Sequence, residues 1–167
     1  MLFRSWHSEN YWIYPSTPEI QSQYVVKFFT QSLASRLDLT IWWTWRDPGG
    51  GAGPNGLITQ SLQRKPAFAA FKVGAEKLNW AQVTFQRNLI SIELGSANLE
   101  GYIFTIRATQ RRLYVLWSND SVNRVVTLPA SQARVIDMYG NISGIVNGTG
   151  TVRVTVGANP LYVETIK

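Results

Sequence analysis

The sequence of 167 residues contains no cysteine and only one histidine, His7. Without cysteine the chain has no disulfide framework, no thiolate metal site, no iron–sulfur cluster and no cysteine nucleophile. With one histidine it has neither a multi-histidine metal site nor an H-E-x-x-H motif. We therefore expect that the protein uses no metal and no cofactor.

Charged residues are also scarce, at 16% of the chain. No apolar run approaches the ~18 residues of a membrane span, and the first ten residues lack the basic start and apolar core of a signal peptide. The formal net charge is +6, but the tightest basic groups are pairs, Arg64-Lys65 and Arg111-Arg112. Dispersed charge favours a solvated basic surface. We expect no membrane and no nucleic-acid partner, with nucleic-acid binding as the weakest alternative, and the compartment stays open.

Apolar residues make up 45% of the chain and aromatic residues 13%, with seven each of Trp, Tyr and Phe. This composition is typical of a globular protein. The chain is too short for a complete (β/α)8 barrel, which needs ~200 residues or more. Two compositional halves meet near residue 80, which predicts a division into residues 1–79 and 80–167.

The first half alternates between helix and strand patterns. The run Ser16-Thr17-Pro18-Glu19 predicts the start of a helix that continues to about Ser35. A β-branched and aromatic run at residues 39–45 predicts a strand, and residues 49–56 form a glycine-rich loop. Pro66 predicts the start of a second helix. The expected apolar positions of the first helix are Ile20, Tyr24, Val25, Phe28, Phe29 and Leu33.

The second half consists of short strand patterns separated by turn signals. Short strands at regular spacing predict an antiparallel β-sandwich, and a segment of this length can hold its own core. The expected strands are residues 82–85, 89–93, 101–109, 113–117, 124–128, 133–137, 152–156 and 162–165.

The candidate chemistry lies where two strand-like segments end. Glu9 stands among polar and aromatic residues after the first segment, and Trp43, Trp45 and Asp47 stand at the end of the second. Functional groups of parallel α/β folds lie on loops at the carboxyl ends of strands. Flat aromatic rings cover the apolar faces of sugars while carboxylates bind their hydroxyls, so the pattern indicates a sugar site. For any single Trp, core packing is the stronger alternative. For Trp43 and Trp45, at a strand end beside a glycine loop, we favour the binding role instead.

These residues carry a resemblance to a known group of enzymes. The runs Ser8-Glu9-Asn10-Tyr11-Trp12 and Leu39-Thr40-Ile41-Trp42-Trp43-Thr44-Trp45-Arg46-Asp47 look like the last strands of a clan A glycoside hydrolase barrel. The stretch Asn55-Gly56-Leu57-Ile58 and then Lys65-Pro66-Ala67-Phe68 is similar to the lead-in to the last barrel helix. Later motifs, among them Tyr114-Val115-Leu116-Trp117-Ser118 and Asn159-Pro160-Leu161-Tyr162-Val163, look like the small β-sandwich that follows the barrel.

The resemblance implies a fold class and a set of site residues. The fold would be α+β and mostly β, with two βα units of a barrel over residues 1–79 and an antiparallel β-sandwich over residues 80–167. Glu9 matches the catalytic nucleophile. Trp43 would be the sugar platform, with Trp45 as its substitute and Trp12 as a further substrate contact. Asp47 and Asn55 would bind sugar hydroxyls.

A retaining glycosidase needs a second carboxyl group, which in clan A commonly follows Asn in an Asn-Glu pair. The chain contains no Asn-Glu pair. We therefore expect the C-terminal portion of a glycoside hydrolase that is inactive alone. Its partners would be the missing barrel half or a second copy, and an oligo- or polysaccharide would bind the complete enzyme.

A non-catalytic function is the alternative to this reading. Tyr102, Tyr114 and Trp117 of the sandwich could stack on sugars, or they could fill its core. Because Trp117 shares a face with Leu113 and Val115, core packing is favoured for it. The resemblance implies that such a domain mostly packs on the barrel, so support of a barrel ranks above sugar binding. The sugar, its linkage and the parent family stay open.

Overall fold

The computed structural model describes residues 17–37, 39–42, 44–48 and 54–166. It is mostly β, with two long helices ahead of two antiparallel sheets. The helices are α1 (Pro18–Ala34), α2 (Pro66–Lys77) and the short α3 (Ser91–Leu94). The strands are β1 (Val83–Asn88), β2 (Leu99–Ile106), β3 (Arg111–Ser118), β4 (Arg124–Leu128), β5 (Gln132–Asp137), β6 (Ile142–Asn147), β7 (Val152–Val156) and β8 (Leu161–Thr165).

Helix α1 begins where the capping pattern predicts it. The Thr17 hydroxyl accepts a hydrogen bond from the Ile20 N–H at 3.2 Å, and Pro18 occupies the first helical position. An N-cap side chain and a proline at this position satisfy or remove N–H groups that the helix itself cannot bond. The helix ends before Arg36, whose φ of 54° turns the chain out of the helical path.

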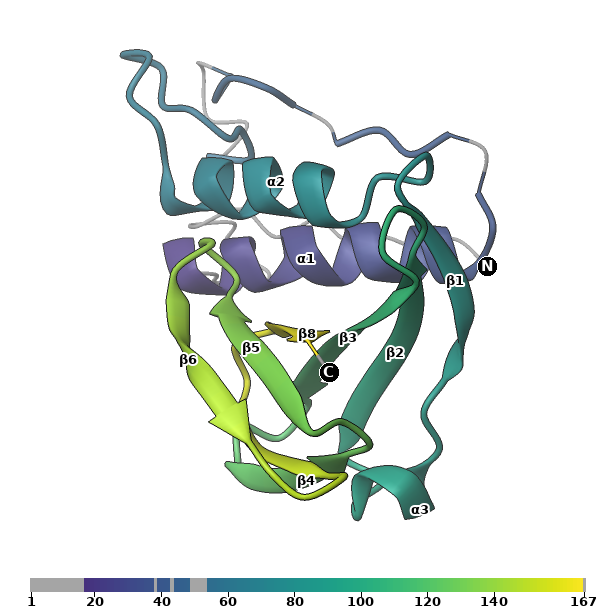
Figure 1. Cartoon of the computed structure of the whole chain (residues 1–167). Coiled ribbons are helices and arrows are strands. Elements are labelled where there is room, and N and C mark those ends of the chain that lie inside the picture. The colour runs from purple at the N-terminus through teal and green to yellow at the C-terminus, as the bar shows by residue number, and fades with distance from the viewer. Residues whose placement is uncertain (1–16, 38, 43, 49–53, 167) are drawn as a thin grey trace.

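The two long helices lie side by side and run in the same direction (Figure 1). At their N-terminal ends, Gln21 of α1 and Lys65, which precedes α2, both donate to the Gly56 carbonyl. Midway, the Phe29 and Phe71 rings meet edge to face at 5.1 Å. A Cβ added to Gly74 would lie 2.8 Å from the Phe29 ring, so glycine permits this close packing.

The larger sheet has six strands in the order β1-β2-β3-β8-β5-β6, and β4 pairs with β7 in a separate two-stranded sheet. Side chains of β3 alternate between two cores, as expected for a strand covered on both faces. Val115 and Trp117 pack toward the helices, with Val25 and Ala70 in the same cluster. Tyr114 and Leu116 pack toward β4 and β7. The long helices therefore share a core with the sheet, and the division after residue 79 stays a prediction.

Most of the expected strands are present, and two have the expected bounds, β4 and β7. The strand predicted for residues 89–93 is wrong, because α3 forms there instead. The Glu93 carboxylate accepts from the Ile90 N–H at 3.0 Å, and Gly95 ends the turn in a left-handed conformation. Strand β6 was not predicted, since its side chains are mostly exposed and it contains Gly144.

The strand predicted for residues 39–45 is also wrong for the part of this segment that the structure describes. Residues 39–42, 44 and 45 belong to no ladder, and Arg46 forms an isolated parallel bridge with Ile58. A strand needs a neighbour to bond its backbone groups, and within the described residues the backbone bonds of this segment are confined to its end, where the Trp45 carbonyl accepts from Leu57 and Ile58. The sequence pattern of a strand is therefore present, but the described residues of this segment pair with no strand of a sheet.

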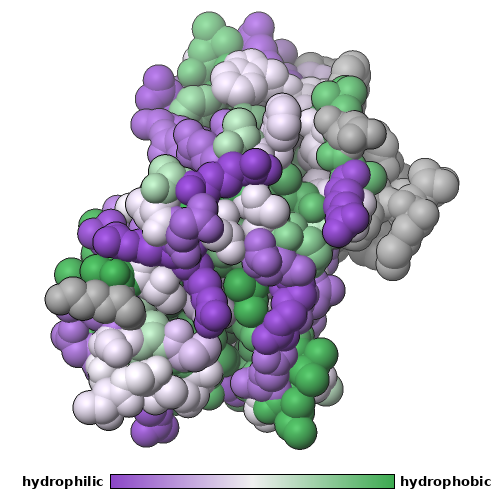
Figure 2. Space-filling model, turned by 45° about the vertical axis from the view of Figure 1, so that its right-hand side comes forward, coloured by the Kyte–Doolittle hydropathy of each residue, from purple (hydrophilic) through white to green (hydrophobic). Residues whose placement is uncertain are grey.

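The surface of the molecule is mixed. Figure 2 shows hydrophobic side chains interrupted by hydrophilic ones across the face in view. Among the described helices, none combines the length and the hydropathy that crossing a membrane requires.

The buried ring of Phe104 gives a direct test of the core between helices and sheet. Phe104 is fully buried and contacts Phe85 at 5.6 Å between ring centroids. Phe104→Ala should lower the free energy of unfolding by about 3 to 5 kcal/mol, because it leaves a cavity in this core. Ile142→Ala is the control, since Ile142 is 62% exposed and should change stability by about 0.5 kcal/mol or less. Urea unfolding measures both, and equal effects would contradict the assigned core.

Candidate functional site

Three of the six expected site residues lie in the described part of the chain. They are Trp45, Asp47 and Asn55. The other three, Glu9, Trp12 and Trp43, lie outside the described residues, so their roles stay predictions. The geometry of the site is therefore the geometry around Trp45, Asp47 and Asn55.

Asp47 is one half of a buried ion pair. Its Oδ1 accepts from Lys65 Nζ at 3.0 Å and from the Gly56 N–H at 2.7 Å. The side chains of Lys65 and Asp47 are only 5% and 11% exposed. Lys65 Nζ also donates to the carbonyls of Pro54, at 2.9 Å, and Gly56, at 3.2 Å. The ammonium group thus joins Asp47, which precedes the glycine-rich loop, to Pro54 and Gly56 at the end of that loop.

Gln21 of α1 reaches the same point from the other helix. Its Nε2 donates to the carbonyls of Asn55 at 3.2 Å and Gly56 at 3.1 Å. Gly56 is required here, because a Cβ would lie 2.4 Å from the carbonyl carbon of Arg46 and from the backbone nitrogen of Asp47. We call Gln21, Asp47, Gly56 and Lys65 the Gly56 junction. Asn55 takes part through its backbone carbonyl.

Trp45 lies beside the junction and keeps much of its indole in solvent. Its carbonyl accepts from the N–H groups of Leu57, at 2.9 Å, and Ile58, at 3.1 Å. Its ring meets Phe68 at 5.5 Å and Phe71 at 6.3 Å, both edge to face, yet Trp45 is 54% exposed. A fixed, half-exposed indole next to a carboxylate can cover the apolar face of a sugar ring.

Sequence reasoning did not identify Gln21 or Lys65 as site residues. Both are polar residues of helix-forming type, and the sequence carries no signal that they are buried. The structure shows their importance through contacts that are distant along the chain: Gln21 reaches residues 34 and 35 positions away, and Lys65 reaches Asp47, 18 positions away across the glycine loop. Among the residues that the structure describes, no group of His, Asp and Glu could hold a metal ion.

A second polar cluster joins α1 to the sheet. Glu100 accepts from the Tyr102 hydroxyl at 2.9 Å and from Asn119 at 2.8 Å, while Trp117 Nε1 donates to Asn119 at 3.2 Å. Burial raises the pKa of the Tyr102 hydroxyl, and the neighbouring Glu100 carboxylate raises it further. The Tyr102 and Trp117 rings stack at 5.2 Å.

The aromatic side chains of the sandwich that could have stacked on sugars are all buried. Tyr102 is 8% exposed, and Tyr114 and Trp117 are fully buried. Lys27 of α1 lies over the Trp117 ring at 5.5 Å, and burial lowers the pKa of its ammonium group, with Glu100 opposing the shift. These rings hold α1 against the sheet and offer no face to a ligand.

No protein-family model matches the chain, and no curated protein matches it. Solved structures do match it in fold. A family 39 glycoside hydrolase from the gut symbiont Bacteroides cellulosilyticus WH2 superposes with a TM-score of 0.71 over 89% of this chain and 30% of its own, at 18% identity. A GH30 endoxylanase from Clostridium papyrosolvens C71 has a TM-score of 0.55 at 11% identity, over 86% of this chain and 38% of its own.

An alpha-amylase from Anoxybacillus has a TM-score of 0.53 at 12% identity, over 92% of this chain and 34% of its own. At these identities the likeness is one of fold. The chain spans about a third of the length of each of these glycoside hydrolases.

The buried ion pair of the Gly56 junction predicts a large effect of neutralising one partner. Lys65→Met should lower the free energy of unfolding by about 3 to 5 kcal/mol, because it leaves the Asp47 carboxylate buried without its cation. The double variant Asp47→Asn with Lys65→Met should lose less, since no unpaired charge remains.

Lys72→Met is the matched control for this prediction. Lys72 is 68% exposed and pairs only with the exposed Glu76, so its loss should cost about 0.5 kcal/mol or less. Urea unfolding curves measure all three variants. A Lys65→Met protein as stable as the wild type would show that the junction does not hold the two helices together.

Proposed function

We propose that this chain is the C-terminal portion of a retaining glycoside hydrolase of clan A. It would contribute the last two βα units of a (β/α)8 barrel and the β-sandwich that follows. The fold supports this proposal, since three glycoside hydrolases contain a similar arrangement over about a third of their length.

The observation that carries the proposal is the path of the chain between α1 and α2. The helices run in the same direction, so the chain must return along them, and it does so through residues 37–46 (Figure 1). Leu37, Leu39 and Ile41 alternate along this return and are 52%, 73% and 65% exposed. Parallel helices with an apolar extended return have the geometry of consecutive βα units whose sheet is incomplete.

Buried polar atoms on the same layer also lack partners. Among the described residues, the Tyr162 hydroxyl on β8 is buried without a hydrogen-bond partner, and Gln21 Oε1 and Trp42 Nε1 are the two such atoms of the helical half. Such atoms cost about 1 to 3 kcal/mol each when they stay unsatisfied, so native structures seldom retain them. A complete barrel would supply backbone or side-chain partners at both positions.

The proposed roles of the site residues follow the resemblance in the sequence. Glu9 is the nucleophile, and Trp43 or Trp45 forms the sugar platform with Trp12 nearby. The half-exposed indole of Trp45 supports a stacking role for it. Asp47 and Asn55 remain proposed contacts to hydroxyls, although the Asp47 carboxylate also holds Lys65 and the loop.

A retaining mechanism needs two carboxyl groups about 5 to 5.5 Å apart, one as nucleophile and one as acid and base. In this proposal the second group comes from a barrel segment that these 167 residues do not contain. At this incomplete catalytic site the chain alone then binds sugar poorly and does not hydrolyse it. Its partner is the remainder of the barrel, and the substrate of the complete enzyme is an oligo- or polysaccharide.

A purely supporting function is the second candidate. The burial of Tyr102, Tyr114 and Trp117 favours it over sugar binding by the sandwich, because no stacking face is free on these rings. In this case the sheet only packs against the helices and stabilises them, and it contributes no residue to sugar binding or catalysis.

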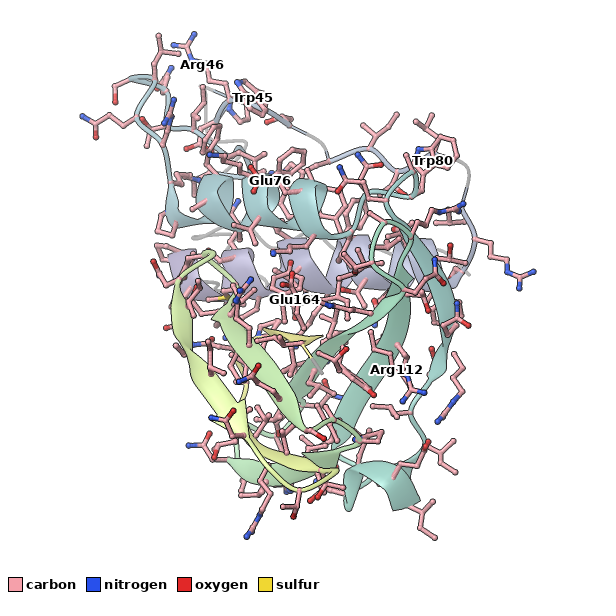
Figure 3. The ribbon with its side chains drawn as sticks, viewed as in Figure 1. Trp45, Arg46, Glu76, Trp80, Arg112 and Glu164 are labelled. Carbon is pink, nitrogen blue, oxygen red and sulfur yellow. The ribbon has the colours of Figure 1, made fainter. Side chains whose placement is uncertain are left out.

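Turnover assays on the purified chain test the proposal. We expect no hydrolysis of aryl glycosides above the uncatalysed rate, because a lone nucleophile has no partner to protonate the leaving group. Glu76→Gln is the control for any residual activity, since Glu76 is exposed on α2 (Figure 3). Turnover by the chain alone that Glu9→Gln abolishes and Glu76→Gln preserves would overturn the proposal.

A further inference from the structure

An open groove lies at the C-terminal ends of α1 and α2. Its volume is about 810 Å³, and its apolar lining comes from Leu33, Leu78 and Phe85 and from Leu37 and Leu39 at the start of the returning segment. Ligand sites commonly have volumes of about 300 to 1,000 Å³ with a mostly apolar lining and a few polar groups. The groove is therefore large enough for several sugar units.

Two guanidinium groups give the groove a positive charge. Arg36 lies just past the end of α1 and Arg107 just past the end of β2, and both line the groove. Both are exposed, and within the described part of the chain neither forms an ion pair. The described lining residues include no carboxylate, and Asp38, which stands between the lining residues Leu37 and Leu39 in the sequence, lies outside the described residues.

Trp80 adds an open aromatic face to the same groove. It is 76% exposed, which is the highest exposure among the described Trp residues. Asn79, its neighbour in the sequence, also lines the groove. Leaving a large indole in water gains nothing for folding, whereas an exposed indole covers the CH face of a sugar well. Asn79 can donate and accept at a sugar hydroxyl.

The groove is separate from the Gly56 junction. The junction includes Lys65 at the start of α2, and the groove includes Leu78 just after its end. A helix of 12 residues is roughly 18 Å long. Figure 3 shows Trp45 above α2 and Trp80 beyond the C-terminal end of that helix.

We propose that this groove binds an oligosaccharide that carries carboxylate groups, at a site distinct from the proposed catalytic one. Guanidinium groups bind carboxylates through paired, charge-assisted hydrogen bonds, and Trp80 covers a sugar ring beside them. The choice of a carbohydrate rests on the proposed function. The choice of negative charge rests only on Arg36 and Arg107.

Isothermal titration calorimetry with tetragalacturonate at low salt tests this inference. We expect binding, with the neutral cellotetraose weaker by about tenfold or more, because it lacks the charge-assisted hydrogen bonds. Arg107→Gln and Arg36→Gln should each weaken tetragalacturonate binding about tenfold, and Trp80→Ala should weaken both sugars. Arg153→Gln on β7 is the control for net charge, since Arg153 is exposed and lies outside the groove.

Four results would overturn the inference. They are no binding of tetragalacturonate, equal binding of cellotetraose, equal binding of a hexaglutamate peptide, and equal losses from Arg107→Gln and Arg153→Gln. Trp80, Arg36 and Arg107 are exposed, so these variants should keep the wild-type unfolding midpoint, which checks their fold. The titration measures binding alone, so its outcome is independent of whether the chain hydrolyses a glycoside.

Discussion

The carbonyl of Gly56 is the point at which the first half of the molecule is fixed. Gln21 reaches it from α1, Lys65 reaches it from the start of α2, and Asp47 accepts the Gly56 N–H. These bonds bring the N-terminal ends of both helices together at the end of the returning segment. The convergence holds the two helices parallel and fixes Trp45, two residues before Asp47, beside the start of α2.

The two sides of the helix pair have very different environments. On one side, Val25, Val26 and Ala70 enter a closed core with the six-stranded sheet. On the other side, Phe28 meets Trp42 at 5.8 Å, and beyond them Ile41 is largely exposed. Burial of apolar surface drives folding, so exposed apolar residues beside a closed core support the proposal that further polypeptide covers this side of the helix pair.

Local chemistry made part of this structure predictable from sequence. Thr17 and Pro18 define the start of α1, and the alternation of Leu113 to Trp117 defines a strand covered on both faces. The strand predicted at residues 39–45 failed because pairing depends on a neighbour that the sequence does not show. The strand predicted at residues 89–93 is wrong because the Glu93 carboxylate accepts from the Ile90 N–H, and this contact favours a helical turn over the strand that the β-branched composition predicts. For the candidate site, the sequence identified Trp45, which is half exposed, as a possible sugar contact. It did not identify Lys65, because the burial of that side chain depends on tertiary contacts that no local pattern encodes.

Hydrogen exchange of the backbone amides of residues 39–42 tests the central claim most directly. In the isolated chain these amides should exchange rapidly, while the Leu57 amide, bonded to the Trp45 carbonyl, should be protected. When the chain is joined to a polypeptide that supplies the preceding barrel units, residues 39–42 should become as protected as Leu57. Slow exchange of residues 39–42 in the isolated chain, or no added protection in the joined protein, would contradict the assignment of this segment as an unpaired barrel strand.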